Sequence, residues 1–218
     1  MTDAEQREAA RQFYNKWHGK GNEDEDARSY WIDVMQNILG VPNATDYLNF
    51  EKKVKINGNT KKIDVYVPET QVLIEQKSLG IPLDKKIKQS DGVELTPYEQ
   101  AKRYNSELVH DEKARWIIVS NFNEIWIYNM NESDPQPTKI FIEEIPNKFP
   151  LLEILVSQKI KKLSEEMELS IKAGDIVGKI YNLFLGQYEN PNDPESLKSL
   201  NMLCVRLVFC LYAEEIGR

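Results

Sequence analysis

Cysteine and histidine are scarce in this 218-residue chain, which has two of each. Cys204 and Cys210 lie six residues apart in one expected helix, and residues at that spacing do not face each other, so we expect no disulfide between them. Two small core residues in a protein of a reducing cytoplasm are the expectation instead. His18 and His110 are too few and too far apart for a zinc site or a Ser-His triad.

Long apolar segments are also missing. Residues 1–7 lack the apolar stretch of a signal peptide. The longest apolar run, residues 200–212, contains Arg206 and is too short to cross a bilayer, so it predicts a buried helix and no membrane contact. Because a strongly apolar helix so near the last residue needs a partner, we expect the chain to continue into further domains.

Positive charge is in deficit, with 28 basic against 35 acidic residues and a net charge of −7. Dedicated nucleic-acid binders are normally basic, so this balance argues against one. Lysines nevertheless crowd residues 52–62 and 85–88, and acids crowd residues 23–26. The lysines between 52 and 62 belong either to a solvated surface or to one that tracks phosphates without reading bases.

Hydrophobic periodicity, caps and turn residues predict an α/β protein. Thr96, Pro97 and Glu99 have the spacing of a capped helix start, and Asn57-Gly58 is a hairpin signal. Residues 79–95 are polar and are expected to form a loop. The expected helices are about 4–18, 24–39, 96–109, 151–166, 171–187 and 194–216. The expected strands are 49–56, 61–67, 71–77, 115–120, 124–129 and 139–143. This order predicts a central mixed sheet flanked by helices in residues 1–147 and an all-helical connector in residues 148–218.

Two of the expected strands carry unusual charges. Side chains alternate along a strand, so Glu75 and Lys77 share a face, and Asp64 stands among apolar residues in the preceding strand. Burial of such charges is costly unless they are paired or bind metal. Two converging carboxylates and a lysine suit Mg²⁺-assisted phosphodiester hydrolysis, in which the lysine offsets developing negative charge. An ordinary ion pair on a half-exposed strand is the simpler alternative.

The next helix adds an amide and a phenol. Gln100 and Tyr104 are four residues apart and therefore lie on one helix face. Beside a nuclease sheet, this face would bring both groups near a metal-bound phosphate. Alone, the same spacing is also typical of an ordinary amphipathic helix.

The ordered set Asp64, Glu75-x-Lys77 and Gln100-x-x-x-Tyr104 resembles the nuclease module of the RecB-like branch of the PD-(D/E)xK superfamily. More narrowly, the chain resembles the N-terminal region of single-polypeptide restriction–modification enzymes of the MmeI type. The segments that carry this resemblance are residues 72–80, 90–104, 115–122 and 207–217.

The resemblance also implies that a glutamate of an N-terminal helix joins the metal site. Glu23 occupies the matching place, but Arg28 stands where a glutamine is expected. The choice among Glu23, Glu25 and Asp26 therefore stays open, as does a plain solvated helix start, because acids favour helix N-termini.

The resemblance implies a Mg²⁺-dependent endonuclease that cuts double-stranded DNA. Full-length relatives would join it to an S-adenosylmethionine-dependent methyltransferase and a target-recognition domain. This chain has no glycine-rich cofactor loop after a strand and no Asn-Pro-Pro-Tyr-like tetrapeptide, so methylation is not expected of it. The alternatives are a non-catalytic DNA-binding or docking module of a methyltransferase, and a repair or anti-phage nuclease coupled to a helicase.

Overall fold

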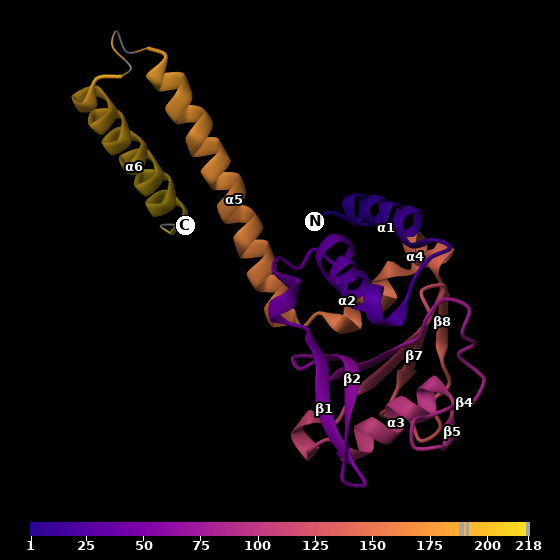
Figure 1. Ribbon diagram of the computed structural model, residues 1–218. Coiled ribbons are helices and arrows are strands. Elements are labelled where there is room, and N and C mark those ends of the chain that lie inside the picture. Colours follow the sequence, from indigo (N-terminus) through magenta and orange to yellow (C-terminus); the bar gives the residue numbers. More distant parts are fainter. Residues whose placement is uncertain (188–189, 191, 217–218) are drawn as a thin grey trace. The chain divides into compact units, whose positions relative to one another are not determined.

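The computed structural model describes residues 1–187, 190 and 192–216 of the chain. Residues 1–162 contain a six-stranded sheet in the order β1-β2-β3-β6-β7-β8; β1, β2, β7 and β8 of this sheet are labelled in Figure 1. Strands β3 and β6 are parallel, and every other neighbouring pair is antiparallel. The sheet is therefore mixed and flanked by helices, as the sequence predicts.

The elements follow the predicted order closely. The strands are β1 Asn49–Ile56, β2 Asn59–Val67, β3 Val72–Gln76, β4 Ile87–Lys88, β5 Glu94–Leu95, β6 Trp116–Ser120, β7 Glu124–Asn129 and β8 Thr138–Phe141. The α-helices are α1 Asp3–Trp17, α2 Glu23–Asp33, α3 Pro97–Glu107, α4 Ile145–Lys148, α5 Gln158–Leu185 and α6 Pro194–Ile216. Short 3₁₀ turns occupy Ala44–Asp46, His110–Glu112, Ile142–Glu144 and Phe149–Leu155.

Local sequence signals fix several of these boundaries. Thr2 and Thr96 each cap a helix with a reciprocal capping box, at the starts of α1 and α3. Between β1 and β2, Asn57 and Gly58 have φ values of 49° and 80°. Two consecutive positive φ values are what a tight two-residue hairpin turn requires, and Asn-Gly adopts them readily.

The two faces of the sheet are covered by different helices (Figure 1). One hydrophobic cluster joins α1 and α2 to inward residues of β2 and β3, including Trp31, Val65 and Ile74. A second cluster joins α3 to the opposite face, where Leu73 of β3 packs with Tyr104. Alternation along β3 thus sends Glu75 and Lys77, which are in phase with Leu73, to the α3 side.

The chain forms two compact units, Met1–Lys162 and Leu163–Arg218. Residues 149–160 pack into the first unit, since Phe149, Leu152, Leu155 and Ile160 all belong to its core. The division expected between residues 147 and 148 stays a prediction about domain organisation.

Three predicted elements differ from the structure. The helix predicted over residues 24–39 is α-helical only to Asp33 and continues as a π turn over Val34–Ile38. The loop predicted over 79–95 contains the small antiparallel pair β4–β5. Instead of helices at 151–166 and 171–187, a 3₁₀ turn over Phe149–Leu155 precedes one continuous helix, α5. Pro150 at the start of that turn and the absence of any breaker between 166 and 171 explain this difference.

The apolar C-terminal helix is not buried as predicted. In α6, Val205 is 68% and Phe209 is 72% exposed. Cys204 is buried, whereas Cys210 is exposed, and neither forms a disulfide. Within the described residues, every helix is too short or too polar to cross a membrane.

Candidate metal centre

Asp64 and Glu75 face each other across neighbouring strands. The antiparallel pairing of β2 with β3 aligns Val65 with Ile74, and the next position in this register pairs Asp64 with Glu75. Glu75 is only 1% exposed, while Asp64 is partly buried. The hairpin relation inferred from the sequence is therefore correct, and both carboxylates lie on the face of the sheet that α3 covers.

Glu23 reaches the same place from the first residue of α2. Its backbone N–H donates to Ser78 Oγ at 3.0 Å, and the Leu79 N–H donates to the Gly21 carbonyl oxygen at 3.0 Å. Gly21 has a φ of 144°, and a Cβ there would lie 2.1 Å from the Phe122 ring. A glycine is thus required where the chain enters α2, and the start of this helix is tied to the segment that follows β3.

The three carboxylates form one cluster. Ligand oxygens of Glu23, Asp64 and Glu75 all lie within 4.8 Å of one another. Two oxygens on opposite sides of a Mg²⁺ ion lie about 4.2 Å apart, since each Mg–O bond is about 2.1 Å. The cluster therefore has the size of a Mg²⁺ ligand set.

Lys77 provides the positive charge of this cluster. Its Nζ lies 2.7 Å from Glu75 Oε1 and 3.0 Å from Glu23 Oε1. The side chain is nearly buried, with 10% exposed. One ammonium thus bridges the carboxylate of β3 and the carboxylate of α2.

Gln76, between the two charged residues of the motif, organises the backbone around the cluster. Its backbone N–H donates to Asp64 Oδ2 at 2.7 Å. On the opposite face of β3, its amide accepts from Trp31 Nε1 at 2.9 Å and donates to the Lys77 carbonyl oxygen at 2.9 Å. Sequence reasoning missed these roles of Gln76 and Trp31. The sequence does contain a sign of these roles: Gln76 is a polar residue at an inward position of an apolar strand. A buried amide needs a hydrogen-bond partner, which predicts a polar group such as an indole N–H opposite it.

Burial and mutual repulsion determine the protonation of the carboxylates. Burial raises the pKa of Asp64 to about 6, against the opposing effect of Lys77. Burial and then the negative charge of Asp64 raise the pKa of Glu75 well above its ordinary value. Burial acts to lower the pKa of Lys77, but the surrounding carboxylates of Glu75, Asp64 and Glu23 outweigh it and raise that pKa. The lysine is therefore charged, and Asp64 and Glu75 hold their protons more tightly than free carboxylic acids do.

One atom of the cluster is a ready ligand position. Among the described residues, Glu75 Oε2 is buried and has no hydrogen-bond partner. A buried acceptor left unpaired costs roughly 1–3 kcal/mol, and more when it is charged. A cation bound by these oxygens would remove this cost and lower the repulsion between the acids, so the residues present fit a hard divalent cation.

Gln100 and Tyr104 lie together on α3, as the sequence predicts. The amide Nε2 of Gln100 donates to Tyr104 Oη at 2.9 Å, and both side chains are buried. Gln100 Oε1 is a second buried acceptor without a hydrogen-bond partner among the described residues. Burial and then Glu75 raise the pKa of Tyr104, so its phenol stays neutral and able to donate.

The other two candidates from the start of α2, Glu25 and Asp26, do not join the cluster. Glu25 is exposed, and Asp26 accepts a hydrogen bond from the Asn22 backbone N–H at 2.9 Å as part of the helix start. Among the three acids that the sequence left open, Glu23 is thus the one that the structure places beside Asp64 and Glu75.

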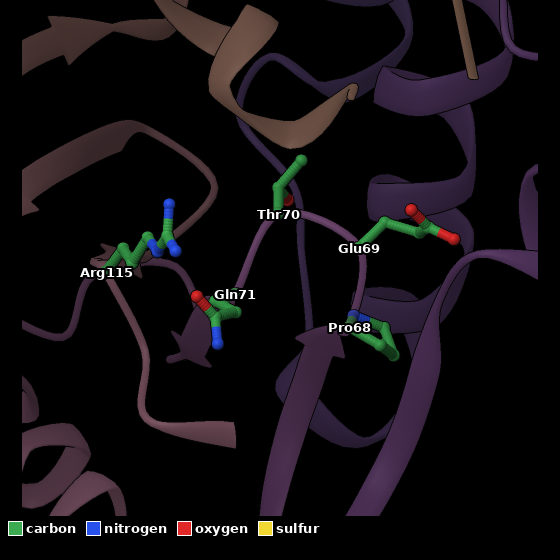
Figure 2. A pocket seen from close by; sticks show the side chains of 5 residues that line it. All are labelled: Pro68, Glu69, Thr70, Gln71 and Arg115. Atoms are coloured by element: carbon green, nitrogen blue, oxygen red, sulfur yellow. The ribbon is translucent and has the colours of Figure 1, made fainter. Parts of the chain in front are cut away.

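A separate hollow of about 470 Å³ lies at the opposite end of β3. In Figure 2, the side chains of Arg115 and Glu69 lie on either side of Thr70, with Pro68 and Gln71 also lining the space. This polar hollow precedes Val72, whereas the carboxylate cluster lies at the other end of the strand. The metal-type cluster is thus distinct from this surface hollow.

The fold and the cluster define an α/β domain with a carboxylate–lysine site on two interior strands of a mixed sheet, β2 and β3. The family model described as MmeI, N-terminal domain, matches residues 8–187. The chain belongs to this family, which places it among restriction–modification enzymes. Comparison with curated proteins and with solved structures gives no match.

Proposed function

We propose that this chain is the Mg²⁺-dependent endonuclease module of a restriction–modification enzyme and hydrolyses phosphodiester bonds of double-stranded DNA. The observation that carries the proposal is the convergence of Glu23, Asp64 and Glu75 on one point beside Lys77. The family match supports the restriction–modification context. In this proposal, methylation and sequence recognition belong to other domains, and S-adenosylmethionine is a cofactor of the methyltransferase alone.

Asp64, Glu75 and Glu23 would hold the cation. A bound Mg²⁺ supplies Lewis-acid polarisation of the phosphate and a more acidic water. Each ligand comes from a different element: Asp64 from β2, Glu75 from β3 and Glu23 from the start of α2, and the Gln76 N–H of β3 also donates to Asp64. Because these elements are joined by hydrogen bonds, the ligands are positioned before a cation arrives.

Lys77 would act on the substrate. Nζ lies between Glu75 and Glu23, so it is placed to donate to a scissile phosphate or an attacking water that occupies the same site. A buried, charged donor aimed at developing negative charge is worth far more than one in water. The raised pKa keeps this donor protonated at neutral pH.

Gln100 and Tyr104 would support the substrate from α3. Their donors and acceptors lie on the side of the sheet that carries the cluster, and the negative charge of Glu75 influences the pKa of the Tyr104 phenol. Neutral donors here suit a phosphate oxygen or a sugar oxygen. Their role is to orient the strand, so their loss should affect cleavage less than the loss of Asp64.

Cleavage of DNA by the complete restriction–modification polypeptide tests the proposal. With Mg²⁺, we expect Asp64→Ala and Lys77→Ala each to lower the cleavage rate by at least about 10²-fold, because each removes a ligand or donor that acts on the reacting phosphate. Chelation of the metal should abolish cleavage in every variant. If either variant cuts as fast as the wild type, the site assignment is wrong and a non-catalytic docking role is favoured.

The role of Glu23 as a ligand can be tested against a matched control, Glu25, two residues further along α2. Glu23→Gln should weaken Mg²⁺ binding, measured by titration calorimetry on the 218-residue chain, because it removes one of three carboxylate ligands. Glu25→Gln removes the same charge at an exposed position and should leave the affinity unchanged. Equal effects of the two variants would show that net charge, not coordination, explains the result.

A further inference from the structure

The β4–β5 hairpin is a small element beside α3 (Figure 1). Its strands, Ile87–Lys88 and Glu94–Leu95, have two residues each and pair antiparallel. Residues 89–93 form the tip, where the Gln89 N–H donates to the Val93 carbonyl oxygen at 2.8 Å. A hairpin this short is not stable alone, so its tip depends on contacts with neighbouring elements to stay in place.

Two polar side chains of the tip contact cations of neighbouring elements. Ser90 Oγ accepts a hydrogen bond from Lys61 Nζ of β2. Asp91 Oδ2 accepts one from Arg103 Nη1 of α3 at 2.7 Å, and the two side chains are 24% and 25% exposed. Arg103, and to a smaller extent Lys61, hold the pKa of Asp91 below its ordinary value. Both cations thus act on the same carboxylate and lie close to each other.

Lys61 lies on the face of the β1–β2 ribbon that is turned toward α3. It pairs with Val54, and paired residues share a face of the ribbon. Val54 is buried in the hydrophobic cluster that also contains Tyr104. Lys53 and Lys55 alternate with Val54 along β1, so they lie on the opposite face, and both are exposed. These two lysines therefore provide a matched control for Lys61.

The hairpin covers the pair formed by Gln100 and Tyr104. A cavity of about 10 Å³, enough for about one water molecule, is lined by both of these side chains and by Lys61, Asp91 and Arg103. Gln100 and Tyr104 are only 8% and 7% exposed. A DNA strand can therefore reach this pair only if a covering element moves, and the weakly packed tip is such an element.

Lys61 and Arg103 together have the chemistry of a phosphate site. An ammonium and a guanidinium both donate to anionic oxygens, and the fork of the guanidinium matches the geometry of a phosphate. In the structure, the hydroxyl of Ser90 and the carboxylate of Asp91 supply the acceptor oxygens instead. Because the ion pair is partly exposed, it contributes little, and a phosphate can replace the carboxylate.

We propose that Lys61 and Arg103 form a phosphate subsite for the DNA backbone, which Ser90 and Asp91 occupy until DNA displaces them. The inference rests on the proposed function, since it assigns a subsite for the substrate of the same site. Displacement of the tip opens the cavity and brings a phosphate next to Gln100 and Tyr104. The tip thus competes with DNA and lowers the affinity of the chain for it.

Binding of a fluorescent DNA duplex to the 218-residue chain in EDTA tests the subsite without any cleavage. The double variant Lys61→Gln, Arg103→Gln should bind at least about tenfold more weakly at low salt. Its plot of log affinity against log salt should be shallower by about 1.8, because each of two phosphate contacts contributes about 0.9 to the slope. Lys53→Gln, Lys55→Gln makes the same change in net charge on the opposite face of the ribbon and should leave affinity and slope unchanged.

Removal of the competing carboxylate should have the opposite effect. Asp91→Asn should tighten binding about two- to fivefold, the effect of one partly exposed ion pair, and misfolding cannot produce such a gain. The substituted amide can still accept from the Val93 N–H, so the tip keeps its turn. Asp84→Asn removes the same charge at an exposed position of the same loop and should leave the affinity unchanged.

A double-mutant cycle shows whether the gain depends on Arg103. Asp91→Asn, Arg103→Gln should bind no more tightly than Arg103→Gln alone, because the carboxylate then no longer competes for the guanidinium. If the effect of Asp91 were only its contribution to net charge, the gain would persist without Arg103. Thermal unfolding of each variant verifies the fold.

The outcomes distinguish this inference from the proposed function. Equal binding by the wild type and the Lys61, Arg103 variant, an equal loss in the lysine control, or no gain from Asp91→Asn would each overturn the subsite. So would a gain that persists without Arg103, or no DNA binding by either the wild type or Asp91→Asn. The expected binding together with no Mg²⁺-dependent cleavage by the complete polypeptide would leave the subsite standing and refute the nuclease.

Discussion

Asp64 lies where the fold favours its neutral form, because burial raises its pKa to about 6 from an ordinary value of 3.8. The protonated side chain is therefore stabilised in the folded state, and this contribution to stability is lost as the pH rises from about 4 to above 6. At neutral pH the ionised carboxylate destabilises the cation-free fold. Such a cost is common where a charge is kept for binding rather than for stability.

Asp64→Asn should raise the free energy of unfolding of the cation-free chain by about 1–3 kcal/mol at pH 7–8. The amide oxygen of the substituted side chain can still accept from the Gln76 N–H, while the buried negative charge is gone. Chemical denaturation in EDTA at pH 4 and at pH 8 measures the effect, and the gain should shrink at the lower pH. A variant that is less stable than the wild type at pH 8 would contradict this account of the site.

Protonation of the same carboxylates should make Mg²⁺ binding depend on pH. Because a ligand must lose its proton to bind, affinity should be highest above pH 6 and fall by at least about tenfold per pH unit below it. The raised pKa of Glu75 adds to this dependence in the same direction. Calorimetry between pH 5 and 8 in two buffers of different ionisation enthalpy would detect the released protons. An affinity that does not change across this range would exclude Asp64 as a ligand.

At the scale of elements, the hydrogen bond from Trp31 to Gln76 joins helix α2 to strand β3. It ties the helix that begins with Glu23 to the strand that carries Glu75. Trp31→Phe removes the indole N–H and leaves a buried amide oxygen unpaired, so we expect a loss of about 1–3 kcal/mol in stability. Mg²⁺ affinity should fall as well, because the two ligand-bearing elements are no longer held together.

Trp17→Phe is the matched control for this prediction. The Trp17 indole also donates to a buried acceptor, Asp33 Oδ2 at 2.8 Å, but Asp33 is at the far end of α2 from Glu23. Loss of the Trp17 indole N–H should lower the melting temperature about as much as loss of the Trp31 N–H does. It should leave Mg²⁺ affinity unchanged. A fall in Mg²⁺ affinity in both variants would mean that general destabilisation, and not this particular bond, affects the site.

Most elements of the first unit could be predicted because their ends carry local signals. Helix and strand boundaries follow within a few residues from the capping residues Thr2 and Thr96 and from the Asn57-Gly58 turn. Each cap accepts a hydrogen bond from a free backbone N–H at the start of its helix, and the turn residues adopt the φ values that the hairpin needs. The short pair β4–β5 carries no such pattern: two strands of two residues each are too short to show a period. The single long helix α5 differs from the prediction because the 3₁₀ turn before it, which has Pro150 near its start, is also held by the packing of Phe149 and Leu155 in the core.

At the scale of the whole chain, the first compact unit should fold by itself. Residues 1–162 contain the sheet, both hydrophobic clusters and the carboxylate cluster. We therefore expect a protein of residues 1–162 to unfold cooperatively and to bind Mg²⁺ like the 218-residue chain. Differential scanning calorimetry and Mg²⁺ titration measure both properties.

Ending the chain at residue 147 should have a different result. This truncation removes Phe149, Leu152 and Leu155, three fully buried side chains worth about 1.5–3 kcal/mol each. Their sum is comparable with the total stability of a small domain, about 5–15 kcal/mol. We expect no cooperative unfolding transition, and a stable protein of residues 1–147 would support the boundary predicted from the sequence.

The sequence by itself determined the α/β class, the order of the elements and the pairing of Asp64 with Glu75, because alternation and turn residues act over a few positions. It also indicated Gln100 and Tyr104, since helix periodicity places residues four apart on one face. Only the tertiary structure selected Glu23 over Glu25 and Asp26 and revealed the bond from Trp31 to Gln76. Those choices depend on how α2 packs against β3 and the residues that follow it, some fifty residues away in the chain. Local sequence patterns act over a few residues and therefore do not determine which distant segments pack together.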